Sequence, residues 1–186
     1  MSKNEKEGIR YNSLIVLFST LIQLSLTLFF AKTIPLASLG VISIVATIFL
    51  ILDGIAEIGF SGGVIQKKKI YIKQINILFY ASILLATSIV VLIYPILYFF
   101  VDEYQLNTWY LLIPISIVFN QIGGVSQSIY KRLLMFKVLF IVEVIYQTIF
   151  MVCILVFILN NYFDYLESFI LAKLISYLFK NILLLT

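Results

Sequence analysis

The stretch ILDGIAEIGFSGGVIQKKKIYIK, residues 51–73, joins a long apolar run to a cluster of lysines. Asp53 and Glu57 lie within its apolar part, and their four-residue spacing places them on one face of a helix. Acidic groups inside a membrane are costly and normally face other helices or a water-filled cavity. The stretch therefore indicates a membrane-spanning helix with a polar face. We expect this helix to end at three glycines: Gly59, Gly62 and Gly63.

The composition is that of a membrane protein rather than of a soluble domain. Of 186 residues, 62% are hydrophobic and 12% are charged, whereas soluble domains carry about 25% charged residues. The apolar residues come in blocks of about 18 to 25, the length at which a helix crosses a bilayer. A transmembrane barrel would instead show short segments of alternating hydrophobicity. We therefore predict an all-α fold, a polytopic transmembrane helical bundle of about six spans.

The expected spans cover residues 14–31, 40–62, 75–101, 111–129, 138–159 and 167–186. We expect them to form one membrane domain, residues 1–186. Because the last segment ends in apolar sequence, we also expect this domain to be part of a longer protein. Cys153 is the only cysteine and there is no histidine, which excludes an intramolecular disulfide and imidazole metal sites. No phosphate-binding glycine-lysine loop occurs. Neither a metal nor a cofactor is predicted.

Basic residues gather in alternate connections, which predicts the orientation of the chain. Membrane proteins keep lysine and arginine on the cytoplasmic side. With a cytoplasmic N-terminus, the outer connections hold Lys32 beside the acidic Asp102, Glu103 and Asp164. Orientation thus explains the net charge of +4, and no nucleic-acid partner is expected. The cytoplasmic connections then hold Lys3, Lys6, Arg10, Lys67, Lys68, Lys69, Lys73, Lys131, Arg132 and Lys137.

Polar residues recur at helical spacing along most of these segments. Close helix packing accounts for most of the serine, threonine and glycine residues among them. The third segment differs, since its polar residues are scattered. The aligned residues are Ser43, Thr47, Asp53, Gly54, Glu57 and Ser61 in the second segment, Asn12, Ser19, Gln23 and Thr27 in the first, Ser116, Asn120, Gly124 and Gln127 in the fourth, Glu143 and Gln147 in the fifth, and Lys173, Ser176, Tyr177 and Lys180 in the sixth.

The ionisable residues need a further explanation, because a central Asp or Lys costs about 2.5–3.5 kcal/mol on insertion. Lys173 lies near the middle of the sixth segment. One interpretation pairs it with Asp53 or Glu57 as a buried structural ion pair. The other places it beside a water-filled path for a polar substrate. Glu143 follows Lys137 closely, so it can reach the cytoplasmic interface.

Three short patterns occur in order: FFAKTIPLASLG at residues 29–40, AEIGFSGGVIQKKK at 56–69 and SIYKRLLMFKVLFIVEV at 128–144. Together they resemble the N-terminal half of polysaccharide flippases (Wzx-type exporters) of the MATE-like multidrug/oligosaccharidyl-lipid/polysaccharide superfamily. Glu57 stands where that family usually has Asp, and Lys32 where it more often has Arg.

The resemblance implies a longer transporter with two lobes around a central cavity, of which this chain is one lobe. It implies alternating-access movement of undecaprenyl-diphosphate-linked oligosaccharide across the bacterial inner membrane, for O-antigen, capsule or exopolysaccharide. The implied partners are this lipid-linked oligosaccharide, membrane lipid and other polysaccharide-assembly proteins. Lysines such as Lys32 and Lys173 would attract anionic groups. Carboxylates such as Asp53 and Glu57 would bind sugar hydroxyls or couple to an ion.

The candidate residues therefore divide into two groups. Those expected to line the substrate or ion pathway are Asp53, Glu57, Lys173, Gln23, Asn120 and Lys32. Those expected to have structural or interface roles are Glu143, Gly59, Gly62, Gly63 and Arg132.

Three other functions stay open. An ion-coupled multidrug or cation antiporter of the same superfamily would use Asp53 and Glu57 as a cation site. A membrane glycosyltransferase or polymerase would carry catalytic residues in sizeable loops. The loops here are short and hold neither paired acids nor metal-ligand spacing, so we do not predict an enzyme. The third is a non-transport membrane subunit.

Overall fold

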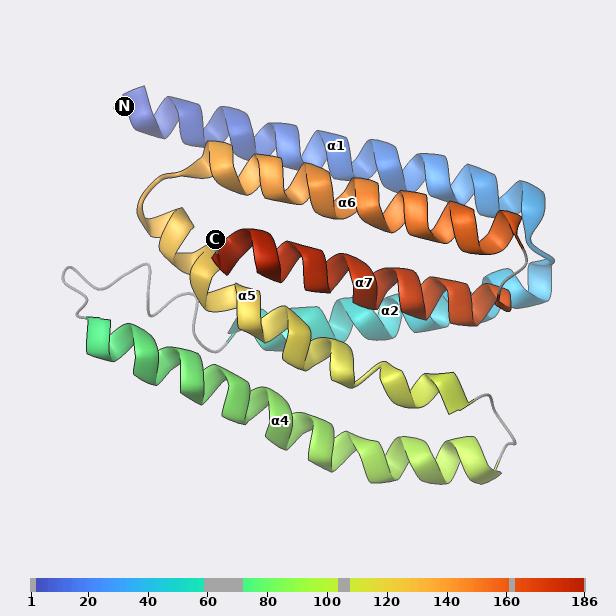
Figure 1. Ribbon diagram of the computed structural model, residues 1–186. Coiled ribbons are helices and arrows are strands. Elements are labelled where there is room, and N and C mark those ends of the chain that lie inside the picture. The colour runs from blue at the N-terminus through green and yellow to red at the C-terminus, as the bar shows by residue number, and fades with distance from the viewer. Residues whose placement is uncertain (1–2, 59–71, 104–107, 161–162, 186) are drawn as a thin grey trace.

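The computed structural model describes residues 3–58, 72–103, 108–160 and 163–185. Within them the chain folds into α-helices joined by short connections, with one short 3₁₀ helix and no strand, so the all-α prediction is confirmed (Figure 1). The glycines 59, 62 and 63 and the lysines 67–69 lie outside the described residues. The helices are α1 (Lys3–Thr33), α2 (Leu36–Ile58), α4 (Ile72–Glu103), η1 (Thr108–Leu112), α5 (Ile115–Arg132), α6 (Phe136–Leu159) and α7 (Tyr165–Leu185).

Prolines set two of the helix starts. The carbonyl of Pro35 accepts the N–H of Leu39 at 3.0 Å, so α2 begins at Leu36, earlier than the predicted 40. Pro114 precedes α5 as its N-cap and lacks an N–H to continue the preceding turn. The fourth predicted span, 111–129, is therefore divided between the end of η1 and α5. Pro95, by contrast, lies inside α4 without ending it.

Four of the described helices are long and apolar enough to cross a membrane: Glu7–Thr33, Lys73–Pro95, Phe136–Leu159 and Tyr165–Leu185. A shorter apolar helix covers Leu36–Ile51. Large apolar side chains on the outside of the bundle are more than half exposed, among them Leu28 on α1 and Leu92 on α4. Apolar surface of this kind is what lipid tails cover, and we conclude that the chain is a multi-pass membrane protein.

The helices alternate in direction, so their ends fall into two sets. The start of α1, the end of α2, the start of α4, the end of α5, the start of α6 and the end of α7 share one end of the bundle (Figure 1). Lys32 ends α1 at the opposite end, where Asp164 precedes α7. The basic residues that the described helices place at the first end are Lys3, Lys6, Arg10, Lys73, Lys131, Arg132 and Lys137. The described basic residues of the connections therefore gather mainly at one end of the bundle, and the side of the membrane on which this end lies stays a prediction.

Helix α6 lies between α1 and α7 (Figure 1). Helix α5 contacts α7 on one side and α4 on the other, and α4 forms the outer edge of the bundle (Figure 1). Helix α2 packs on α5 and α7 and makes little contact with α1. The residues that α6 buries recur every three or four positions, which is one face of a helix: Leu139, Val142, Tyr146, Phe150, Ile154 and Ile158. Since α1 and α2 pack on different partners, a space is left between them.

Candidate functional site

A cleft of about 500 Å³ occupies the space between α1 and α2, with α6 and α7 at its base. Its mouth carries the exposed side chains of Gln23 and Ser43, and its base includes the buried rings of Tyr146 and Tyr177. Among the described residues, α4 contributes nothing to its lining. This agrees with the scattered polar residues of that segment. The polar residues of the cleft are Gln23, Thr27, Ser43, Asn120, Glu143, Tyr146, Gln147, Lys173, Tyr177 and Lys180.

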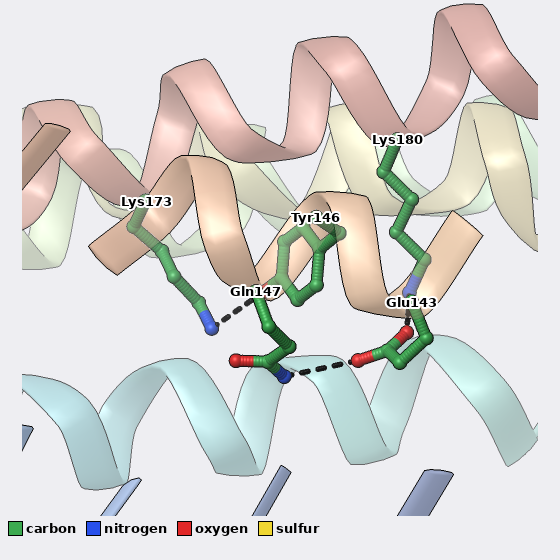
Figure 2. A network of polar contacts seen from close by, with 5 residues as sticks. All are labelled: Glu143, Tyr146, Gln147, Lys173 and Lys180. Carbon is green, nitrogen blue, oxygen red and sulfur yellow. Dashed lines mark hydrogen bonds and ion pairs between the residues drawn. The ribbon is translucent and has the colours of Figure 1, made fainter. Parts of the chain in front are cut away.

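One ion pair crosses the base of the cleft from α7 to α6. Lys180 Nζ lies 3.5 Å from Glu143 Oε2, and the two side chains are 14% and 18% exposed. The other oxygen of Glu143 accepts a hydrogen bond of 3.0 Å from Gln147 Nε2, one turn further along α6. Figure 2 shows the resulting chain of contacts, from Lys180 to Glu143 and from Glu143 to Gln147. The carboxylate is thus bound both by its own helix and by the neighbouring one.

Lys173 is surrounded by aromatic rings. Its Nζ donates a hydrogen bond of 2.8 Å to Tyr146 Oη, and lies 5.1–5.4 Å from the ring centroids of Tyr146, Phe150 and Tyr177. Tyr146 and Tyr177 stack on each other, with centroids 5.6 Å apart. A cation near an aromatic face gains about 0.5–2 kcal/mol per interaction, so the rings of Phe150 and Tyr177, together with the hydroxyl of Tyr146, replace part of the hydration that Lys173 loses in the bundle.

Tyr146 connects the two lysines. Lys180 Nζ lies 4.9 Å from its ring centroid, while Lys173 binds its hydroxyl. Lys173 and Lys180 are seven residues apart, so both point from the same face of α7, and Figure 2 shows Tyr146 between them. Among the described side chains, two positive charges and one negative charge therefore line the base of a cleft whose walls are largely apolar. Such a site can hold a polar, charged group by hydrogen bonds and Coulomb attraction.

The comparisons with known proteins identify the family. A family model described as polysaccharide biosynthesis protein matches residues 29–186, which include the end of α1 and all later helices. The chain belongs to this family. The resemblance found in the sequence is thereby confirmed, and the chain has a role in polysaccharide biosynthesis. No curated protein and no solved structure matches the chain.

The structure of this polysaccharide biosynthesis protein brings three of the predicted pathway residues to one cleft: Gln23, Asn120 and Lys173. Lys32 is exposed at the end of α1 and is not among the cleft residues. Asp53 and Glu57 belong to the last turns of α2, but their side chains lie outside the described residues. Their roles, and the pairing of either with Lys173, stay predictions.

The two described residues that the sequence assigned to structural roles, Glu143 and Arg132, lie in different parts of the bundle. Glu143 lines the cleft and binds Lys180, so it belongs to the site itself. Arg132 is the last residue of α5, at the end of the bundle where basic residues gather. Among the described residues, no group of three His, Cys, Asp or Glu side chains comes together.

The sequence-based set of pathway residues omitted Tyr146, Gln147 and Lys180. Gln147 and Lys180 were visible as members of polar faces, but Tyr146 counts as an apolar position of α6 in any hydrophobic pattern. Its position between Glu143 and Gln147, within one turn, is the signal that could have identified it. A tyrosine beside two polar residues on one helical face can direct its hydroxyl into the same cavity.

Proposed function

We propose that this polysaccharide biosynthesis protein is a flippase rather than an enzyme. Its substrate would be an oligosaccharide linked to undecaprenyl diphosphate, moved across the bacterial inner membrane for surface polysaccharide assembly. The observation that carries the proposal is the charged base of the cleft, where Lys173 and Lys180 lie within a bundle whose described core is mainly apolar. A flippase must hold a polar head group inside the membrane while the lipid tail stays in the bilayer.

The dimensions and chemistry of the cleft support this function. A volume of about 500 Å³ falls within the range of about 300–1,000 Å³ that is typical of ligand pockets. Ammonium groups bind phosphate and carboxylate oxygens, and the amides of Gln23, Asn120 and Gln147 can exchange hydrogen bonds with sugar hydroxyls. The apolar exterior of the bundle suits the lipid tail.

The proposal includes the arrangement of the complete transporter. The chain would form the N-terminal lobe of a two-lobe protein, with its N-terminus and the basic end of the bundle in the cytoplasm. A second lobe would face α1 and α2 and close the cleft into a cavity with alternating access. Its partners would be the lipid-linked oligosaccharide, membrane lipid and other proteins of polysaccharide assembly.

Replacement of the cleft lysines tests this function. We expect Lys173→Ala and Lys180→Ala each to reduce surface polysaccharide export at least fivefold, at unchanged protein level in the membrane. Each variant removes a positive charge from the base of the cleft. Lys137→Ala is the matched control, because Lys137 is exposed at the start of α6 and outside the cleft.

Export of surface polysaccharide is measured in cells whose own copy has been replaced by each variant. Normal export by both cleft variants would contradict the proposal. Proteoliposomes give a second test, since uptake of a labelled organic cation without movement of lipid-linked oligosaccharide would favour the antiporter instead.

A further inference from the structure

The ion pair between Lys180 and Glu143 is a loose contact at the base of the cleft. Its Nζ–Oε2 distance of 3.5 Å is longer than the 2.7–2.9 Å of a strong charge-assisted hydrogen bond. Both side chains face the cleft and remain partly accessible. Lys180 and Glu143 are therefore both part of the surface that a group in the cleft would contact.

Each partner also has a second contact that survives when the pair opens. Glu143 keeps the 3.0 Å hydrogen bond from Gln147 on its own helix. Lys180 keeps the ring of Tyr146, 4.9 Å from its Nζ. A buried charge that loses its only partner is strongly destabilising. These second contacts reduce the cost of separating Lys180 from Glu143.

The location of the pair suggests what replaces Glu143. Lys180 lies at the base of the cleft, two helical turns from Lys173, and Tyr146 contacts both lysines. An anionic group bound there would meet the ammonium group of Lys180 beside the ring of Tyr146, with Lys173 on the far side of that ring (Figure 2). Glu143 supplies the same kind of oxygen that a phosphate or a sugar carboxylate would supply. It therefore competes with an anionic substrate for Lys180.

We infer that Glu143 is a built-in competitor: it binds Lys180 while the cleft is empty and yields Lys180 to the anionic group of the substrate. This inference rests on the proposed function and goes beyond it. When the substrate leaves, Glu143 binds Lys180 again and lowers the affinity for the anion. The exchange keeps binding weak enough for release, so a stronger site would be a slower transporter.

Neutralisation of Glu143 separates this role from a structural one. We expect Glu143→Gln to bind a short-chain isoprenyl diphosphate about two- to fivefold more tightly than the wild type, the range that a partly exposed ion pair is worth. We also expect it to export less polysaccharide, because release becomes slow. Binding is measured by calorimetry on the purified full-length transporter. Loss of a merely structural contact would weaken binding instead.

Two controls define the mechanism. Glu167→Gln removes the same charge from the first turn of α7, outside the cleft, and should leave the affinity unchanged. In a Lys180→Met background, Glu143→Gln should no longer tighten binding, because the two residues act on each other. If Glu143→Gln folds poorly, Glu143→Asp shortens the side chain, keeps the charge, and should tighten binding to a smaller extent.

The outcomes distinguish this inference from the proposed function. Wild-type binding of the diphosphate with no gain in Glu143→Gln would overturn the exchange and leave the flippase function standing. An equal gain in the Lys180→Met background would also overturn it, since bulk charge would then be the cause. No binding of the diphosphate by any variant, together with no export, would overturn both. An acidic oligosaccharide without the lipid diphosphate, used as the second probe, identifies which anionic group binds Lys180.

Discussion

At the scale of single residues, the site depends on how the bundle accommodates charged side chains. Lys173 is surrounded by three aromatic rings and binds the hydroxyl of Tyr146, whereas Lys180 binds Glu143. The two lysines therefore obtain their stabilisation in different ways although they share one face of α7. Lys173 is held by a hydroxyl and by ring contacts, and Lys180 by an opposite charge as well as by the ring of Tyr146.

The hydroxyl of Tyr146 provides a test of the first arrangement. Tyr146→Phe keeps the stacked ring and removes the oxygen that accepts the hydrogen bond from Lys173. We expect the free energy of unfolding to fall by about 1.5–3 kcal/mol, the value of a hydrogen bond to a charged group. Thermal unfolding in detergent measures it. Tyr11→Phe, a change of the same kind near the start of α1 and outside the cleft, is the control and should have little effect.

At the scale of helices, the contact between α5 and α7 depends on Gly123. A Cβ at this position would collide with Asn181 Oδ1 and lie 3.1 Å from a methyl carbon of Leu184. Asn181 is itself buried and donates a hydrogen bond to the carbonyl of Phe119 on α5. A glycine thus lets the two helices approach closely, and an amide joins them where no water competes.

Adjacent glycines allow a matched test of this contact. We expect Gly123→Ala to lower the free energy of unfolding by about 1–3 kcal/mol, the usual cost of overpacking. Gly124→Ala should be neutral or slightly stabilising, because its Cβ would meet only Gln121 Oε1, at 3.6 Å, and alanine favours the helix. Thermal unfolding in detergent compares the two variants. Equal stability of both would show that Asn181 moves aside freely.

At the scale of the whole molecule, the space between α1 and α2 follows from their different packing partners. Helix α1 lies on α6, while α2 lies on α5 and α7. The cleft between them carries polar side chains at its mouth and charged ones at its base. The remaining outer surface exposes large apolar side chains. The two kinds of surface should therefore differ in their access to water.

Cysteine labelling tests this difference in intact membranes. With Cys153 replaced by alanine, single cysteines at Gln23 and Ser43 should react with a membrane-impermeant thiol reagent, because both positions lie at the mouth of the cleft. A cysteine at Leu28 or Leu92, both more than 70% exposed on the apolar exterior, should stay unlabelled under lipid. Equal labelling of all four positions would mean that the cleft is no more aqueous than the bundle exterior.

The sequence by itself determined the class of protein, the approximate helices and the separation of charge. Block length, the 3.6-residue period and the bias of basic residues are properties of consecutive residues. Prolines 35 and 114 shifted two predicted boundaries for local reasons as well. The same period placed Gln23, Asn120 and Lys173 on polar faces of their helices.

Only the tertiary structure decided which of these residues meet. The pairing of Lys180 with Glu143, the three rings around Lys173 and the exclusion of Lys32 from the cleft all depend on contacts between helices that are far apart in the chain. Helical periodicity places a residue on a face but does not set the rotation of that face toward a neighbouring helix. That rotation is set by packing, including the close approach at Gly123, and so the site became visible only when the helices were assembled.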